Sequence, residues 1–164
     1  MEEWKVNLLD TDNAMLVGDI GEAIALHYLS NHNFHTITRP TKFRLNDKWN
    51  IILISAHYQK QRMNYTYFLT DRQKEYLNEF SAWDYVAFKE ECEPYLVVHE
   101  GKTHYRDWRN PYLVEVKTVR GERRPHKKPT SNSVSKAKEL EFKPILVTVR
   151  LLENLDIFVE ASEF

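Results

Sequence analysis

The stretch PYLVEVKTV, residues 111–119, decides the fold of this chain. It is rich in apolar and β-branched residues, a composition typical of a strand. Side chains two positions apart point to the same face, so Glu115 and Lys117 share one face while Val114 and Val116 fill the other. A strand that is apolar on both faces is usually covered on both. A carboxylate and an ammonium buried there need a partner or a ligand, so the strand predicts a site inside a covered sheet.

Composition narrows the class of protein. The chain has 164 residues, enough for one domain with a sizeable core, and its 42% hydrophobic and 29% charged residues are ordinary for a globular protein. A formal net charge of −1 means that any nucleic-acid binding must rest on local charge. The single Cys92 excludes an internal disulfide and a multi-cysteine zinc site, and fits a reducing compartment. Without a long apolar run or an apolar signal region, we expect a cytoplasmic (intracellular) protein with no membrane partner.

Apolar periodicity along the rest of the chain predicts an α/β fold. We expect the first helix, from Ala14 to about Ser30, to bury an apolar stripe that leaves Glu22 to one side. That stripe is Leu16, Val17, Ile20, Ala23, Ile24, His27 and Tyr28. The later elements expected are strands over 34–39, 49–57 and 65–69 with a turn at 59–64, a helix over 72–80, a strand over 83–88, a hairpin over 95–108, a loop over 121–132, a helix over 133–142, and strands over 145–149 and 155–160.

A second acid accompanies the 111–119 strand. Asp84 lies in the expected strand 83–88, on the same face as Val86 and Phe88. Two carboxylates that converge from neighbouring strands make an oxygen-rich site for Mg²⁺ or Mn²⁺, which can activate water at a phosphodiester. Lys117 can hold that water or stabilise charge on the phosphate. We therefore predict Asp84 and Glu115 as metal ligands.

A basic run follows Lys117 directly. Such a run can hold a polyanionic backbone, so the sequence predicts nucleic acid as the partner. The residues are Arg120, Arg123, Arg124, Lys127 and Lys128.

Together these residues resemble a known family. Glu22 on the first helix, Asp84 after Trp83, and the Glu115-x-Lys117 pattern are similar to the PD-(D/E)xK nuclease superfamily, in particular to archaeal Holliday junction resolvases. The segments 18–29 (GDIGEAIALHYL) and 136–147 (KAKELEFKPILV) resemble the first helix and the later helix-strand unit of those proteins. The resemblance covers residues 14–39, 83–88 and 112–149, and Trp83 stands where the family usually has proline.

The resemblance implies a restriction endonuclease-like core in residues 1–164, a single domain with an extra segment at about 41–80. Its central mixed β-sheet would be flanked by helices in the order αβββαβ. It also implies a metal-dependent DNA endo- or exodeoxyribonuclease using Mg²⁺ or Mn²⁺, resolvase-like on branched DNA, and a homodimer. The catalytic residues implied are Glu22, Asp84, Glu115 and Lys117.

Two other interpretations stay open. The chain could be a nucleic-acid-binding or assembly protein that keeps the nuclease fold without activity, or an unrelated α/β module whose Glu115-x-Lys117 is structural. Each feature also has an ordinary explanation: an exposed edge ion pair, a solvated Asp84, a helix-face charge at Glu22 and a solvated basic loop.

Overall fold

The computed structural model describes residues 12–38, 51–58, 61–68, 71–79, 83–89, 95–99, 102–106, 111–125, 129–154 and 156–164. The helices are α1 (Ala14–Asn31), α3 (Asp71–Glu79) and α4 (Ser131–Glu139). The strands are β1 (Phe34–Thr38), β2 (Ile51–Tyr58), β3 (Gln61–Phe68), β4 (Tyr85–Lys89), β5 (Tyr95–His99), β6 (Lys102–Arg106), β7 (Tyr112–Arg120), β8 (Lys143–Leu151) and β9 (Ile157–Glu163). The 111–119 stretch thus forms β7, as predicted. The expected turn at 59–64 is wrong in part, because β3 already begins at Gln61.

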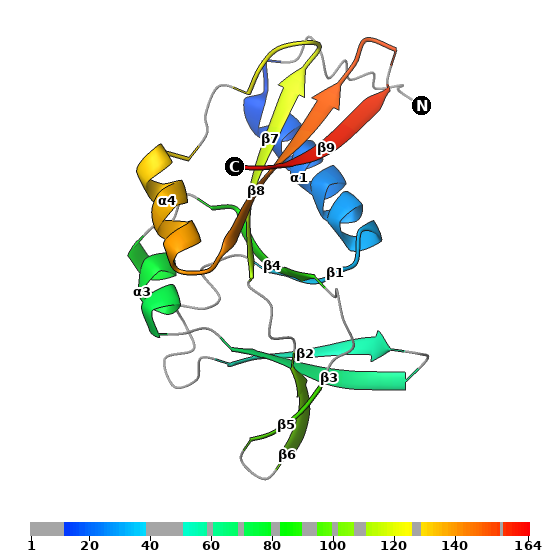
Figure 1. Ribbon diagram of the computed structural model, residues 1–164. Helices are drawn as coiled ribbons and strands as arrows, with labels where there is room; N and C mark the ends of the chain where they lie inside the picture. The colour runs from blue at the N-terminus through cyan, green and yellow to red at the C-terminus, as the bar shows by residue number, and fades with distance from the viewer. Residues whose placement is uncertain are drawn as a thin grey trace.

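A five-stranded sheet in the order β1-β4-β7-β8-β9 forms the centre of the fold (Figure 1). β7 and β8 run parallel with α4 between them in sequence, and the other neighbours are antiparallel. A parallel pair needs such a crossover, usually a helix. The α/β class with a central mixed sheet and flanking helices is therefore confirmed.

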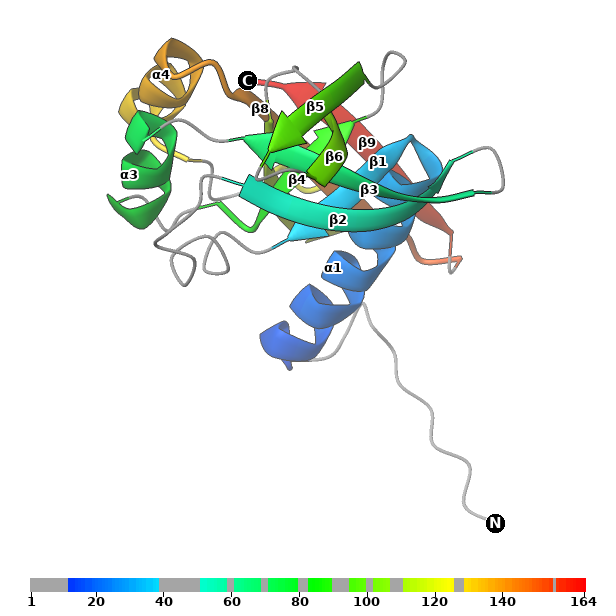
Figure 2. The same cartoon turned by 90° about the horizontal axis from the view of Figure 1, so that it is seen from below.

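The two stretches between the core strands build a second sheet, in the order β2-β3-β6-β5. β2 and β3 form one antiparallel hairpin and β5 and β6 another, and the two hairpins join where Tyr65 pairs in parallel with Tyr105. This sheet lies at the end of the molecule where β1 and β4 are found (Figures 1 and 2). The extra segment at 41–80 therefore shares its sheet with residues 95–106, while residues 41–50 lie outside the described part of the chain.

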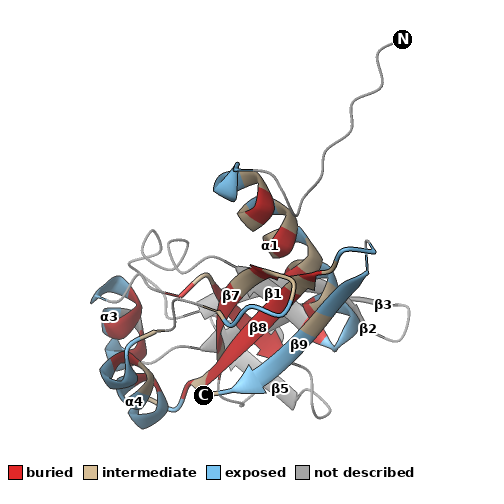
Figure 3. Cartoon of the chain, turned by 90° about the horizontal axis from the view of Figure 1, so that it is seen from above, coloured by how far each residue is buried: buried red, intermediate tan, exposed pale blue. Residues whose placement is uncertain are grey.

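Separate apolar clusters cover the two faces of β7. Val114 and Val116 belong to the cluster beneath α1, and Leu113 belongs to the cluster beneath α3 and α4. This confirms that the strand is covered on both faces. β8 is buried over most of its length and β9 is largely exposed (Figure 3). No helix in the described residues is long and apolar enough to cross a membrane.

Asn13 caps the start of helix α1, because its side chain accepts a hydrogen bond from the Leu16 amide at 3.0 Å. The expected apolar stripe is wrong in part, since Ala23 and His27 are exposed. The buried residues instead repeat every four positions: Val17, Gly21, Ala25 and Leu29.

A close approach between α1 and β7 explains this choice of buried face. A Cβ placed on Gly21 would lie 1.6 Å from Oγ1 and 2.7 Å from Cβ of Thr118. Only glycine leaves room for Thr118 there. The helix therefore packs on its small residues, which brings Glu22 to the margin of the buried face instead of turning it to solvent.

Candidate metal and substrate site

Asp84 lies one residue before β4, where the ladder between β4 and β7 ends. The last residue pair of this ladder is Tyr85 with Val114. The Asp84 amide donates to the Val114 carbonyl at 3.0 Å, and its Oδ2 accepts from the Val116 amide at 2.7 Å. The carboxylate is therefore fixed at the edge of β7, at the point where the neighbouring strand stops.

Glu115 and Lys117 lie beside Asp84 on β7. Glu115 is only 5% exposed, and its Oε1 forms an ion pair with the Lys117 ammonium, whose side chain is 25% exposed. Its second oxygen, Oε2, is buried and has no hydrogen-bond partner among the described residues. A buried acceptor without a partner is costly, and such atoms are rare in folded proteins. The ion pair is therefore not the exposed edge pair of the ordinary explanation.

The pKa of Glu115 reflects its burial and the charges that lie close to it. Burial raises the pKa of Glu115 from 4.5 to about 7, Lys117 opposes the rise, and the neighbouring charge of Asp84 adds to it. A carboxyl in such a place favours an additional cation, because a cation removes both the repulsion from Asp84 and the unsatisfied oxygen. The donor set, two carboxylates with a buried unpaired oxygen, fits a hard divalent ion that completes its shell with water and substrate oxygens.

A buried hydrogen-bond network holds the residue before Asp84. Trp83, 2% exposed, donates from Nε1 to the Tyr76 hydroxyl at 2.8 Å. That hydroxyl in turn lies 2.9 Å from the Ser133 carbonyl oxygen and 3.1 Å from Ser133 Oγ. The network thus joins α3 and α4 to the start of β4. Trp83 packs in the core, edge-on to Phe164, as expected of a packing tryptophan.

Glu22 is placed apart from this pair. Its Oε2 accepts a hydrogen bond from the Tyr85 hydroxyl at 2.8 Å, on the face of the sheet that α1 covers. Glu115 and Lys117 alternate with Val114 and Val116 and so point to the opposite face. Within the described residues no three acidic, histidine or cysteine side chains form a group able to hold a metal. The structure therefore brings Asp84, Glu115 and Lys117 together and does not add Glu22 to them.

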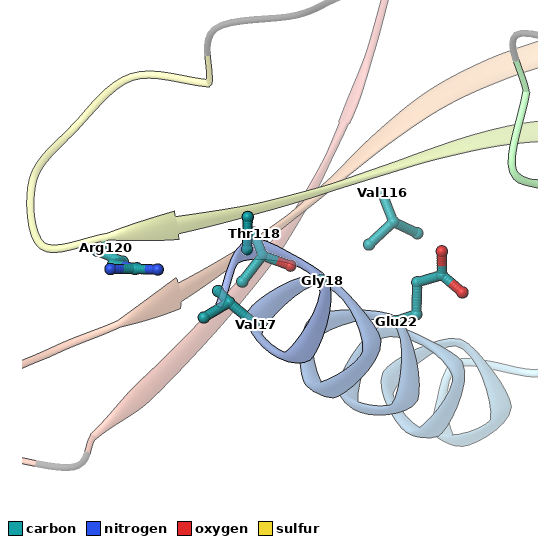
Figure 4. A pocket seen from close by; sticks show the side chains of 7 residues that line it. Val17, Gly18, Glu22, Val116, Thr118 and Arg120 are labelled. Atoms are coloured by element: carbon teal, nitrogen blue, oxygen red, sulfur yellow. The ribbon is translucent and has the colours of Figure 1, made fainter. Parts of the chain in front are cut away.

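Glu22 instead lines an open groove between α1 and β7, about 260 Å³ in volume. The groove has Glu22 at one end and Arg120 at the other, with Val17 and Thr118 between them (Figure 4). Its other lining residues are Ala14, Val17, Gly18, Val116 and Thr118. β7 runs past β4 from residue 115 onward, so this groove follows the part of β7 that β4 does not pair.

The predicted basic contacts are placed only in part. Arg120 ends β7 in the groove, and Arg123 and Arg124 are exposed in the turn that follows. Arg150 of β8 holds this turn by donating to the carbonyls of Gly121 at 3.3 Å and Arg123 at 2.8 Å. Lys127 and Lys128 lie outside the described residues.

Sequence reasoning missed several residues that shape the site. No sequence motif indicates the hydrogen bonds that Tyr76, Ser133 and Tyr85 make. Strand parity is the one available signal, because Tyr85 alternates with Asp84 and must face α1 if Asp84 does not. Comparisons of the chain with known protein families, with curated proteins and with solved structures find no match.

Proposed function

We propose that this chain is a divalent-metal-dependent nuclease that hydrolyses phosphodiester bonds in DNA. The observation that carries the proposal is the arrangement of Asp84, Glu115 and Lys117, with the buried, unpaired Oε2 of Glu115. A buried oxygen without a partner is rare in folded proteins, and a bound ion is one explanation for it.

The chain's own residues have separable parts in this reaction. Asp84 and Glu115 would hold Mg²⁺ or Mn²⁺, which supplies an activated water and charge neutralisation when bound. Lys117, charged and partly exposed beside them, would contact a phosphate oxygen and stabilise the charge that grows there. Water adds to phosphorus and loses one proton, the bond from phosphorus to one sugar oxygen breaks, and that oxygen takes up a proton.

The topology supports the finer fold assignment. Around the central sheet the elements follow in the order α1, β1, β4, β7, α4 and β8, with β9 added at the edge. This order is consistent with the αβββαβ core that the resemblance implies, in which Asp84 before β4 and Glu115-x-Lys117 on β7 would be the catalytic positions. Resolvase-like cutting of branched DNA and a homodimer stay predictions of the resemblance.

Cleavage of labelled DNA tests the proposal. Single-stranded, duplex and four-way-junction DNA are incubated with the wild-type chain with and without Mg²⁺. We expect Mg²⁺-dependent cleavage that Asp84→Asn or Lys117→Met lowers by about 10²–10³-fold or more, the scale for losing one group that stabilises a transition state.

Matched controls separate chemistry from folding. Glu139→Gln and Lys136→Met remove a carboxylate and an ammonium from exposed positions on α4 and should cleave like the wild type. Cleavage that survives in both Asp84→Asn and Lys117→Met overturns the proposal. DNA binding without any cleavage would favour the inactive nucleic-acid-binding protein instead.

A further inference from the structure

We propose that the groove between α1 and β7 holds one unpaired nucleotide of the substrate strand, next to the phosphate that is hydrolysed. The inference rests on the proposed function and deepens it, because it names the kind of strand that the site selects.

The position of the groove links it to the reactive groups. Val116 is shared between them: its side chain lines the groove, and its amide donates to Asp84 at 2.7 Å. From Val116 to Arg120 the groove follows β7 for four residues, roughly 13 Å at about 3.3 Å per residue. Because Asp84 is held at the edge of β7 by the Val116 amide, a strand bound at Asp84 can pass around that edge to reach the groove on the other face.

The polarity of the groove matches a nucleotide. One end offers the carboxylate of Glu22, fixed by Tyr85, which can accept a hydrogen bond from a base amino group. The other end offers the guanidinium of Arg120, which can bind a phosphate. Apolar atoms of Val17 and Val116, which line the groove together with Thr118, suit the face of a base or a sugar. A nucleotide combines the features that these groups would bind: a hydrogen-bond donor, an apolar face and an anionic phosphate.

The size of the groove argues for an unpaired nucleotide. Its volume of about 260 Å³ lies just below the roughly 300–1,000 Å³ of ordinary small-molecule pockets. That space suits a single nucleotide and not a base pair. An unpaired base also exposes the edge and the face that Glu22 and the apolar walls would contact, whereas duplex pairing and stacking cover them.

Gly18 allows a direct test, because it lines the groove and a Cβ added to it meets nothing within 4 Å. Gly18→Leu therefore puts an apolar side chain into the groove from a position where its first carbon meets no other atom, and it replaces a poor helix former with a good one. Ala23→Leu is the matched control, because it puts the same side chain on the exposed side of the same helix. Thermal unfolding of both variants checks that the fold is kept.

The assay compares a duplex with the same sequence carrying an unpaired nucleotide beside the cleaved bond. The wild type and Ala23→Leu are expected to prefer the unpaired substrate about tenfold in KM, a difference of about 1.4 kcal/mol. Gly18→Leu is expected to lose that preference, so that its KM values for the two substrates become equal. Arg120→Gln should lower the slope of log Kd against log salt by about one, because it removes a single phosphate contact.

The outcomes separate the two proposals. Cleavage in which Gly18→Leu behaves like Ala23→Leu, or a salt slope that Arg120→Gln does not change, overturns the groove and leaves the nuclease standing. If the chain binds single-stranded DNA without cutting it, and Gly18→Leu weakens that binding, the nuclease proposal is overturned and the groove proposal stands. A wild-type chain that neither binds nor cuts DNA overturns both.

Discussion

The two faces of β7 carry different kinds of side chain. One face carries the buried Glu115 and the partly exposed Lys117, which form an ion pair beside Asp84. The other carries Val116 and Thr118, on which α1 packs closely. The first face contains an unsatisfied oxygen and crowded charge, whereas the second is built for close fit. Chemistry and packing are thus separated across one strand, and changes on the two faces should have opposite effects on stability and activity.

The largest expected effect on stability comes from the packing face. Gly21→Ala puts a methyl group inside Thr118, so α1 or β7 must shift, and overpacking of this kind typically costs about 1–3 kcal/mol. Gly18→Ala, one turn earlier on the same helix, meets nothing and should stabilise the helix by up to about 1 kcal/mol. Urea unfolding of the two variants measures the difference. Equal stabilities would contradict the close contact between α1 and β7.

The charged face should respond in the opposite way. In the metal-free protein the pKa of Glu115 is about 7, above its ordinary value of 4.5. Between these values the folded chain holds more protons than the unfolded chain, so the free energy of unfolding falls as pH rises from about 4.5 to about 7 and then levels off.

Glu115→Gln removes that titration. We expect the free energy of unfolding of the variant to depend less on pH than that of the wild type, and to be higher at about pH 8. The variant should also lose its cleavage activity. Urea unfolding at about pH 5 and about pH 8, without divalent cations, measures this. The exposed Glu139→Gln serves as control. A Glu115→Gln variant that is less stable than the wild type at the higher pH would show that the ion pair with Lys117 is structural.

The network behind Asp84 should contribute both to stability and to metal binding. Tyr76→Phe leaves the ring in place but removes the acceptor for the buried Trp83 Nε1, which should cost about 1–3 kcal/mol. Because Trp83 precedes Asp84, the same variant should also bind metal more weakly, which calorimetric titration with Mn²⁺ measures. Trp83→Phe combined with Tyr76→Phe removes the donor as well and should recover part of the lost stability. A double variant with no recovery would contradict the hydrogen bond between the two side chains.

Much of this arrangement could be predicted from the sequence, because it depends on the regular spacing of apolar and charged residues along each helix and strand. The alternation of β7 places Glu115 with Lys117 and away from Val116, and the elements α1, α4 and β8 follow from their apolar spacing. The pairing of Asp84 with β7 required only that the start of β4 lie beside the middle of β7. These features follow from backbone geometry within a short stretch of chain.

Other features could not be derived, because they depend on contacts between distant residues. The buried face of α1 is set by the fit of Gly21 to Thr118, ninety-seven positions further on (118 − 21). The parallel pairing of β3 with β6 and the hydrogen bond from Tyr85 to Glu22 likewise join segments that lie far apart in the chain. No local sequence pattern predicts such contacts. The spacing of apolar residues predicted that α1 would bury its more apolar stripe. The helix instead buries a face with small residues, because that face allows close packing.

Binding of Mn²⁺ to the wild-type chain and to Asp84→Asn, followed by calorimetry, tests the central claim most directly. If the charged face of β7 is a metal site, the wild type should bind the ion in a step that also raises its free energy of unfolding. Asp84→Asn should bind at least about tenfold more weakly, while the exposed control Glu139→Gln binds like the wild type. A wild-type chain that binds no Mn²⁺, or an Asp84→Asn variant that binds it equally well, would contradict the account.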